Sequence, residues 1–434
     1  MILTFVAWLP ALFASWICFF RSPQKALYSV YLPVLLLLPA IFLARTYGFP
    51  QLSFHQTTVI PITLFTVFST GWRWHWSLID FLVLMVIFVG AFSEAQNADL
   101  HEGINRLANL LCNVGGPYVV GKALIHSKQM SIPISKRLVL LMCVNIVLGL
   151  YELRMTAVPQ VFITNYFFPD QSALDWPPLY RYGFVRMSGP FMSPIFLGIA
   201  ISLAILLHYW LIKTKLANKK YQYLEAAILA FGLFATFSRG PWLATLLGLF
   251  MAGAAFSRHL KKSLFARFGL VCIAAFAIFS FFLNFQSVPT SETEGTILYR
   301  ANLWEKYEAL INEKMWLGWG LQNFPKEGNM ASIDNNYLFL WILNGLLGLL
   351  PFLGILFWGS LRLVRKGILS VRTAPLTSSL AIVFFAIYVS FAVVCSTVYL
   401  GLQVESLFYL FVGWSEGFLL DRKTVLANGK EVTG

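Results

Sequence analysis

The sequence predicts an all-α membrane protein that crosses the bilayer many times. Of its 434 residues, 58% are hydrophobic and only 12% are charged, whereas a soluble domain carries about 25% charged residues. The mean hydropathy is +0.70, and the apolar residues form continuous runs instead of the alternating pattern of a transmembrane barrel. This composition excludes a secreted disulfide scaffold, a nucleic-acid-binding domain and an ordinary cytosolic enzyme.

The apolar runs provide for twelve or thirteen transmembrane helices, because each crossing needs about 20 residues. The number depends on the third run, which is short, leads into a Trp-rich stretch at 71–76 and would also suit a re-entrant segment. No linker or internal repeat divides the chain, so we expect one integral membrane domain over residues 1–434. The runs lie near 2–20, 26–44, 57–71, 77–95, 104–122, 138–157, 190–212, 222–238, 241–257, 268–286, 336–358, 375–397 and 400–420.

Two connections between the runs, 158–189 and 287–335, are much longer than the others. Long loops in a compact protein commonly carry function. The second loop also contains a short helical pattern at 303–311. We therefore expect the chemistry of this protein to be located in these two loops.

The distribution of basic residues predicts the orientation of the chain. Lys and Arg are enriched in cytoplasmic loops, which explains the net charge of +13 without a nucleic-acid partner. With a cytoplasmic C-terminus, both long loops lie at the outer face, and most of the 32 basic residues are cytoplasmic. The outer exceptions are Arg45, Arg106, Arg154, Arg181, Arg186, Arg239, Arg300, Lys306, Lys314 and Lys326.

Three of these outer arginines are candidates for an anion site. Arg239 lies in a Phe-Ser-Arg-Gly turn between two spans, where a charge is expensive and is a functional candidate by default. Arg186 precedes two Pro residues where the first long loop enters a span, and Arg300 lies in the second long loop. Each alone would also suit a solvated or snorkelling side chain, but together their guanidinium groups match the oxygens of a phosphate.

The sequence resembles the O-antigen ligase and Wzy-type polymerase superfamily of bacterial surface-polysaccharide assembly. The resemblance covers residues 186–350, and the N-terminal 150 residues match only as hydrophobic spans. The matching motifs are, in order, Arg186-Met-Ser-Gly-Pro-Phe-Met-Ser-Pro, Phe-Ser-Arg239-Gly, Arg300-Ala-Asn-Leu-Trp304, Leu317-Gly-Trp-Gly320, Asp334-Asn335 and Gly345-Leu-Leu-Gly348.

The resemblance implies a glycosyltransferase whose donor is a glycan on undecaprenyl diphosphate at the outer face of the bacterial inner membrane. An acceptor hydroxyl would attack the anomeric carbon, and the lipid diphosphate would leave. We expect no cofactor and no metal, because the sequence has neither an Asp-x-Asp pair nor a P-loop. The expected partners are the lipid-linked oligosaccharide donor, a glycan acceptor and the bilayer, with a chain-length regulator as a further candidate and no nucleic acid.

One departure from the family bears on the reaction. Ligases of this family carry a His before the Asn of the penultimate motif, and that His is taken as the catalytic base. Here the position is Asp334, and no histidine lies in the second long loop. This difference favours a polymerase of O-antigen, capsule or exopolysaccharide repeat units over a ligase that transfers glycan to lipid A core or protein.

The expected catalytic residues are Asp334 as the base and Arg239 and Arg300 at the leaving diphosphate. Asp334 has two other interpretations, because it could orient an arginine or cap the helix that follows. The expected substrate-binding residues are Arg186, Asn335, Trp304 and Glu405, although Glu405 could instead pair with an outer arginine.

A transporter or flippase is the alternative from a different class of protein. Such a protein should carry ionisable residues in mid-span and related halves with broken helices. The unexplained charges of this sequence instead lie at the outer face, which favours an enzyme.

Overall fold

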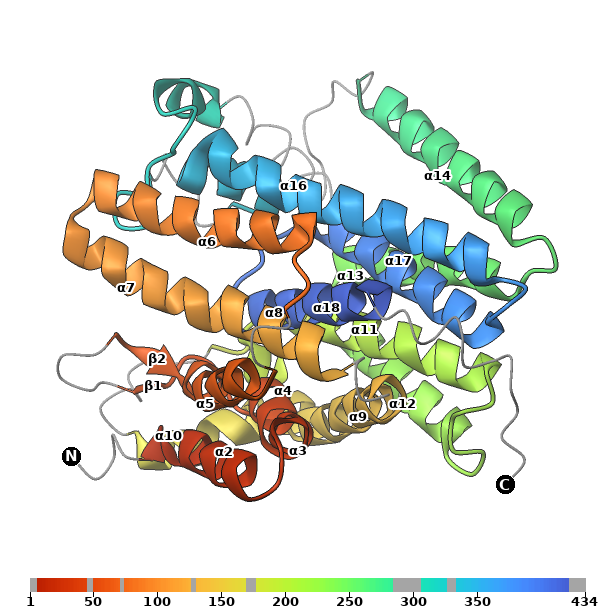
Figure 1. The fold of residues 1–434 in the computed structure, drawn as a ribbon, viewed down its shortest axis with the longest axis horizontal. Coiled ribbons are helices and arrows are strands. Elements are labelled where there is room, and N and C mark those ends of the chain that lie inside the picture. Colours follow the sequence, from red (N-terminus) through yellow and green to blue (C-terminus); the bar gives the residue numbers. More distant parts are fainter. Residues whose placement is uncertain are drawn as a thin grey trace.

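The computed structural model describes residues 6–44, 50–70, 74–125, 130–168, 177–283, 306–325 and 333–420. Helices dominate these residues (Figure 1), and the two-residue strands form only two antiparallel pairs, β1 (Leu43–Ala44) with β2 (Leu52–Ser53) and β3 (Tyr180–Arg181) with β4 (Phe184–Val185). The α-helices are α2 (Leu9–Phe20), α3 (Pro23–Ala26), α4 (Leu32–Leu37), α5 (Phe54–Thr70), α6 (Leu78–Asn97), α7 (Leu100–Leu110), α8 (Gly116–Val120), α9 (Ser131–Met155), α10 (Pro159–Phe167), α11 (Pro194–Lys213), α12 (Gln222–Ala235), α13 (Arg239–Ala252), α14 (Leu260–Leu283), α16 (Asn336–Ser370), α17 (Pro375–Cys395) and α18 (Leu402–Leu420).

The prediction of a polytopic all-α membrane protein is confirmed. In the described ranges, five helices are long and apolar enough to cross a membrane, namely α6, α9, α11, α16 and α17. Shorter apolar helices, α2 and α12, lie in other predicted spans, and the short third run forms a single 17-residue helix, α5, despite Pro61. Residues 306–313 are also helical, which agrees with the pattern in the second long loop. The number of twelve or thirteen crossings stays a prediction.

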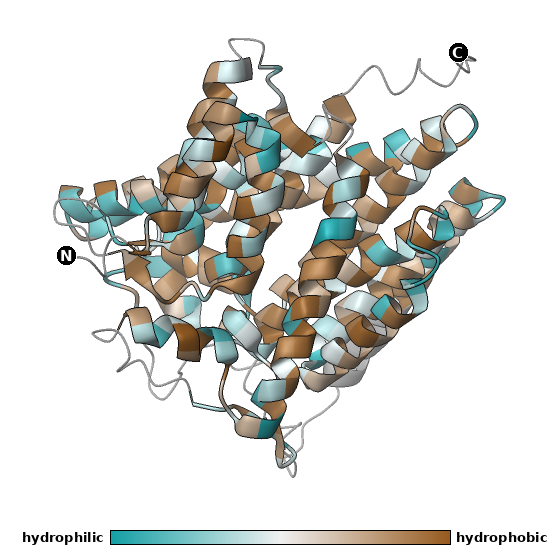
Figure 2. Cartoon of the chain, turned by 90° about the horizontal axis from the view of Figure 1, so that it is seen from below, coloured by the Kyte–Doolittle hydropathy of each residue, from teal (hydrophilic) through white to brown (hydrophobic). Residues whose placement is uncertain are grey.

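The outer surface of the bundle is strongly apolar. Phe19, Phe68 and Phe357 are each at least 70% exposed, and hydrophobic residues dominate the helices while polar residues gather mostly at helix ends and loops (Figure 2). A soluble monomer rarely exposes large apolar patches. The lipid tails of a bilayer would cover these side chains.

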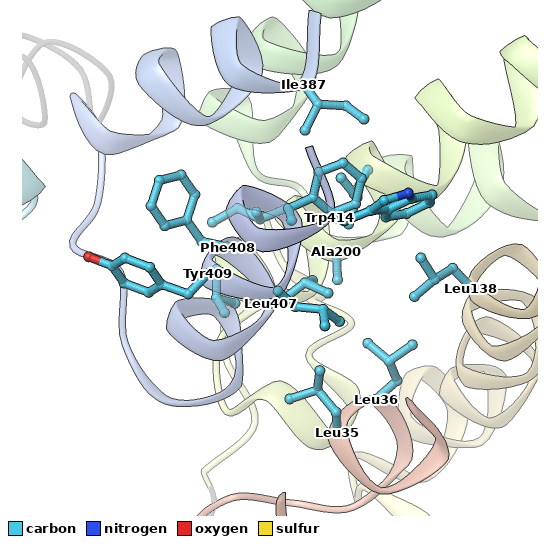
Figure 3. Packing of buried hydrophobic residues seen from close by; sticks show 14 of the residues in the cluster. Leu35, Leu36, Leu138, Ala200, Ile387, Leu407, Phe408, Tyr409 and Trp414 are labelled. Carbon is cyan, nitrogen blue, oxygen red and sulfur yellow. The ribbon is translucent and has the colours of Figure 1, made fainter. Parts of the chain in front are cut away.

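Helix α18 lies at the centre of the bundle. Leu407, Phe408 and Trp414 of α18 pack among Leu35 and Leu36 of α4, Leu138 of α9, Ala200 of α11 and Ile387 of α17 (Figure 3). On another side, the backbone of α18 touches the chain around α8, because a Cβ at Gly413 or Gly417 would collide with the carbonyl groups of Tyr118 or Lys122. Small residues that let helix backbones approach closely are typical of membrane helix packing.

Two buried ion pairs join helices at the end of the bundle that we predict to be cytoplasmic. Lys122 donates to both carboxylate oxygens of Asp80 at 2.6 Å, and Arg362 donates to both oxygens of Glu416 at 2.9 and 2.7 Å. Removing one partner of such a pair would leave an uncompensated buried charge. The first pair therefore fixes α6 to the π-helical segment Gly121–Ile125, and the second fixes α16 to α18.

At the opposite end, α16 is broken at Gly345, which has φ 65° and ψ −169°. The preceding segment of the second long loop docks into the break. The amide of Trp319 donates to the carbonyl of Ile342 at 2.8 Å, and the amide of Leu346 donates to the carbonyl of Met315 at 2.9 Å. The Leu-Gly-Trp-Gly and Gly-Leu-Leu-Gly motifs therefore form one structural unit, in which the loop replaces the hydrogen bonds that the helix lacks.

The C-terminal end of α6 holds the docked segment from its other side. Ser93 donates to the carbonyl of Leu317 at 2.5 Å, and Asn97 donates to the carbonyl of Gly318 at 3.0 Å. The buried carboxylate of Glu94 accepts the backbone N–H groups of Leu321 and Gln322. Part of the second long loop is thus fixed to the rigid bundle.

We predict that Gly345→Ala destabilises the protein. A Cβ at Gly345 would collide with the backbone of Trp316, and φ 65° itself disfavours a side chain, so we expect a loss of about 1–3 kcal/mol or more in the free energy of unfolding. The measurement is thermal unfolding of the purified protein in lipid nanodiscs. Gly269→Ala is the matched control, because a Cβ at Gly269 meets nothing within 4 Å, and equal stability of the two variants would contradict the prediction.

Candidate functional site

The end of the first long loop folds into a hairpin that leads to Arg186. Tyr182 and Gly183 connect β3 to β4 with φ 53° and 78°, which are the positive values that a tight two-residue hairpin turn requires. The amide of Arg186 then donates to the carbonyl of Leu179 at 2.8 Å. The hairpin therefore fixes the backbone from which the Arg186 side chain extends.

Arg186 reaches the turn between α12 and α13, which we call the arginine turn (residues 236–240). Its Nε donates to the carbonyl of Thr236 at 3.0 Å, and its Nη2 donates to Oγ of Ser238 at 2.9 Å. Arg181 donates to the carbonyl of Phe237 at 2.8 Å. Arg186 and Arg181 thus both bond to the turn that contains Arg239.

The backbone of the arginine turn is strained. Phe237 has φ 46°, a conformation that costs a bulky residue about 1–3 kcal/mol and that is concentrated at functional sites. The ring of Phe237 stacks on that of Phe184, with ring centroids 5.7 Å apart, and the bond from Arg181 holds its carbonyl. The hairpin therefore maintains the strained conformation.

Arg239 is the first residue of α13 and is exposed. Its guanidinium donates to the hydroxyl of Tyr182 and lies 5.9 Å from the centre of the Tyr182 ring. No side chain caps α13 in the part of the chain that the structure describes. A cation is unfavourable at the positive end of a helix dipole, whereas that end suits an anion. Arg239 therefore lies at a helix end whose electrostatics suit an anion.

Glu152 of α9 anchors the loop beneath Arg186. Its buried carboxylate accepts three hydrogen bonds: from the hydroxyl of Ser188 at 2.5 Å, from the backbone N–H of Ser188 at 3.0 Å and from the backbone N–H of Gly189 at 2.9 Å. These donors lie at the start of a short 3₁₀ helix, Gly189–Phe191, in which the Gly-Pro sequence occupies the first two positions. Our sequence analysis missed Glu152, although an acidic residue within an apolar run is itself a signal of function.

Asp334 lies at the start of α16, beside the loop between α17 and α18 (residues 396–401). Burial raises the pKa of Tyr399 in this loop, and the negative charge of Asp334 raises it further. Asn336 accepts the amide of Leu400 at 2.8 Å. On its other side the same loop meets the arginine turn, because a Cβ at Gly240 would collide with Oγ1 of Thr397. This loop therefore contacts both the arginine turn and the beginning of α16.

The helix cap at this position is Asn335 and not Asp334. Oδ1 of Asn335 accepts the amides of Tyr337 and Leu338 at 3.0 and 3.2 Å. The capping interpretation of Asp334 was therefore wrong, because the helix begins one residue later than that interpretation requires. Asn335 was expected to bind substrate, and its Oδ1 takes part in the cap.

The remaining predicted residues are not all at the arginine turn. Glu405, in the first turn of α18, interacts electrostatically with Arg106 and lies beside Asn113. The expectation that Glu405 pairs with an outer arginine is thus consistent with Arg106 as its neighbour. Arg300 and Trp304 lie outside the described residues. Within the described ranges, no three His, Cys, Asp or Glu side chains lie together as metal ligands would.

The fold and this arrangement define a multi-pass helical membrane protein with clustered arginines at one end of its bundle. Residues 224–353 match the family described as O-antigen ligase. The match includes Arg239, Asp334 and Asn335 and supports an activity of the O-antigen ligase or polymerase type in general. The comparison with curated proteins found no match.

We predict that Glu152→Gln weakens both folding and activity. An amide offers one acceptor oxygen where the carboxylate accepts three hydrogen bonds, so buried donors lose their partner at a cost of about 1–3 kcal/mol. The variant should unfold at lower temperature and form less polysaccharide in cells. Glu308→Gln is the control, because Glu308 is exposed, and a Glu152→Gln protein as stable and active as this control would contradict the prediction.

Proposed function

We propose that the protein polymerises lipid-linked repeat units of a bacterial surface polysaccharide at the outer face of the inner membrane. The observation that carries this proposal is the meeting of Arg186 and Arg239 at the arginine turn, beside the loop that also adjoins Asp334. The distribution of basic residues supports an outer position for this end of the bundle. The match of residues 224–353 to the O-antigen ligase family supports the general chemistry.

The donor in this proposal is a glycan on undecaprenyl diphosphate. As the bond between the anomeric carbon and the diphosphate oxygen breaks, negative charge accumulates on the leaving group. Preorganised cations near that charge stabilise the transition state. We assign this role to Arg239 and Arg300, with Arg186 binding the diphosphate, and the uncapped first turn of α13 would add backbone N–H groups.

The acceptor hydroxyl must lose its proton as its oxygen bonds to the anomeric carbon. We assign Asp334 as the base that takes this proton, while the diphosphate leaves with the electron pair of the broken bond. The reaction then needs no oxidant, reductant or nucleotide, because the diphosphate bond of the donor supplies the free energy. We also propose that no metal takes part, since the arginines would balance the charge of the diphosphate.

The presence of Asp334 where ligases of the family carry His favours a polymerase. Transfer of glycan to lipid A core or protein remains the second candidate, since the family match supports ligases and polymerases alike. A chain-length regulator would be a partner of a polymerase only. A deletion strain distinguishes the two, because a surface glycan of a single repeat unit indicates lost polymerisation, and accumulated lipid-linked polymer indicates lost ligation.

We predict that Arg239→Lys lowers the rate of glycan transfer severely. Lysine keeps the positive charge but loses the planar fork that matches two phosphate oxygens, so we expect a loss of about 10-fold or more, and about 100-fold or more for Arg239→Ala. The measurement is polymer formation by purified protein at matched abundance. Arg258→Lys is the control, because Arg258 is also exposed. Wild-type polymer from Arg239→Ala would refute the assigned diphosphate site.

We predict that Asp334→Asn lowers turnover about 100-fold or more, because an amide cannot accept the proton. Asp334→His should recover part of the activity. Histidine acts as a base only when neutral, so this activity should rise with pH around its ordinary pKa of about 6.5. The control is Asp99→Asn, since Asp99 is exposed and caps α7, a role that Asn also fulfils. An active Asp334→Asn enzyme would exclude Asp334 as the base and leave the arginine assignment standing.

A further inference from the structure

Helix α7 carries a stripe of polar residues on a side that contacts the protein, and two large apolar residues on the outside. Leu100 and Ile104 are 72% and 55% exposed. The polar residues recur at intervals of three or four and form one stripe on the opposite side, which we call the α7 polar stripe. It consists of Glu102, Asn105, Arg106 and Asn109 of α7, and of Asn113 in the π-helix that directly follows, Leu111–Gly115.

The stripe faces α5 and α18. Gln56 of α5 donates to Oδ1 of Asn109 at 3.1 Å. Oδ1 of Asn113 lies 3.2 Å from Nε2 of His55 and accepts a hydrogen bond from the hydroxyl of Ser406 at 3.2 Å. Polar groups within a membrane bundle are expensive, and they face the interior or a water-filled space where they serve function.

The stripe is not fully satisfied by the protein. Asn105 is half-buried, and its side chain makes no hydrogen bond with the described residues. Nearby in α18, the fully buried Gln403 donates to the carbonyl of Leu38, but its Oε1 has no partner among the described residues. Buried polar atoms are nearly always paired in native proteins, so the unpaired Oε1 of Gln403 indicates a polar occupant of this region. The amide of Asn105 is only half-buried and is accessible to such an occupant.

The α7 polar stripe lies at the same end of the bundle as the arginine turn. Gln322, in the docked segment of the second long loop, donates to Glu102 at 3.2 Å. The positive charge of Arg106 acts on the carboxyl group of Glu405 in the first turn of α18, and α18 directly follows the loop that contacts both Gly240 and Asn336. The start of α18 thus has the stripe on one side, and the loop before it adjoins the arginine turn.

We propose that the α7 polar stripe, together with His55 and Glu405, binds the acceptor oligosaccharide of the transfer reaction. This inference rests on the proposed function and adds a second binding site to it. Sugar hydroxyl groups donate and accept at once, as do the amides of Asn105 and Asn109, and the guanidinium and carboxylate of Arg106 and Glu405 bind pairs of neighbouring hydroxyls by stronger, charge-assisted bonds. The donor diphosphate and the acceptor sugar would then approach Asp334 from different sides.

The test uses the purified full chain in lipid nanodiscs. The donor is the lipid-diphosphate-linked repeat unit extracted from a strain that lacks this gene, and the acceptor is the oligosaccharide released from that lipid by mild acid. The variants are Asn105→Ala and Asn109→Ala, with His101→Ala as the control on the exposed side of α7. Thermal unfolding of each variant is measured in parallel, and Asn105→Ala removes no hydrogen bond between described residues.

Each stripe variant should raise the KM for the acceptor about threefold to tenfold, the effect of losing one hydrogen bond. The KM for the donor should stay within about twofold of the wild-type value, because the stripe binds no diphosphate. An unchanged acceptor KM in Asn105→Ala would overturn the proposal, and so would an increase confined to the donor KM. If the wild-type protein transfers no sugar from this donor, the proposed function fails and this proposal fails with it.

Discussion

The structure depends on one constraint, which is that backbone polar groups inside a bilayer must find partners within the protein. Unbroken helices meet this constraint by themselves, but this chain is interrupted at Gly345, at Phe237 and around Ser188. At each interruption another segment supplies the missing partners: the docked loop at Gly345, Arg181 and Arg186 at the arginine turn, and Glu152 at Ser188. Irregular backbone within a bilayer is tolerated only where it is buried in protein or lines a water-filled cavity.

These interruptions lie at one end of the bundle, which is where we propose that the chemistry occurs. The opposite end is held by the buried pairs of Lys122 with Asp80 and of Arg362 with Glu416. The central helix α18 connects the two ends, with Glu416 at one and Glu405 at the other. A rigid helix bundle therefore positions side chains that a flexible loop could not hold at fixed distances.

The helical runs and the arginines of the candidate anion site can be predicted from the sequence because their signals are local. A long apolar run defines a helix, and a charge such as Arg239 in an apolar setting is visible in the sequence itself. The partners of those residues are tertiary and have no such signal. No spacing connects Trp319 to the break at Gly345, and the shift of the cap from Asp334 to Asn335 depends on where α16 begins.

The α7 polar stripe has a periodic signal that was overlooked. Most of its residues lie in the apolar run 104–122, whose prediction as a membrane span masks the polar periodicity. The electrostatic interaction of Arg106 with Glu405 has no such signal, because α7 and α18 are far apart in the sequence. The contacts of Glu152 in α9 have no local signal either, because its three donors lie in a loop that is distant in the sequence.

The central claim is that the arginine turn binds the diphosphate of a lipid-linked glycan. The most direct test is an experimental structure of the full chain in a nanodisc with undecaprenyl diphosphate bound. The account predicts diphosphate density within hydrogen-bonding distance of the guanidinium groups of Arg186 and Arg239, at the start of α13. Density at another part of the bundle, with both guanidinium groups still bonded only to protein, would contradict it.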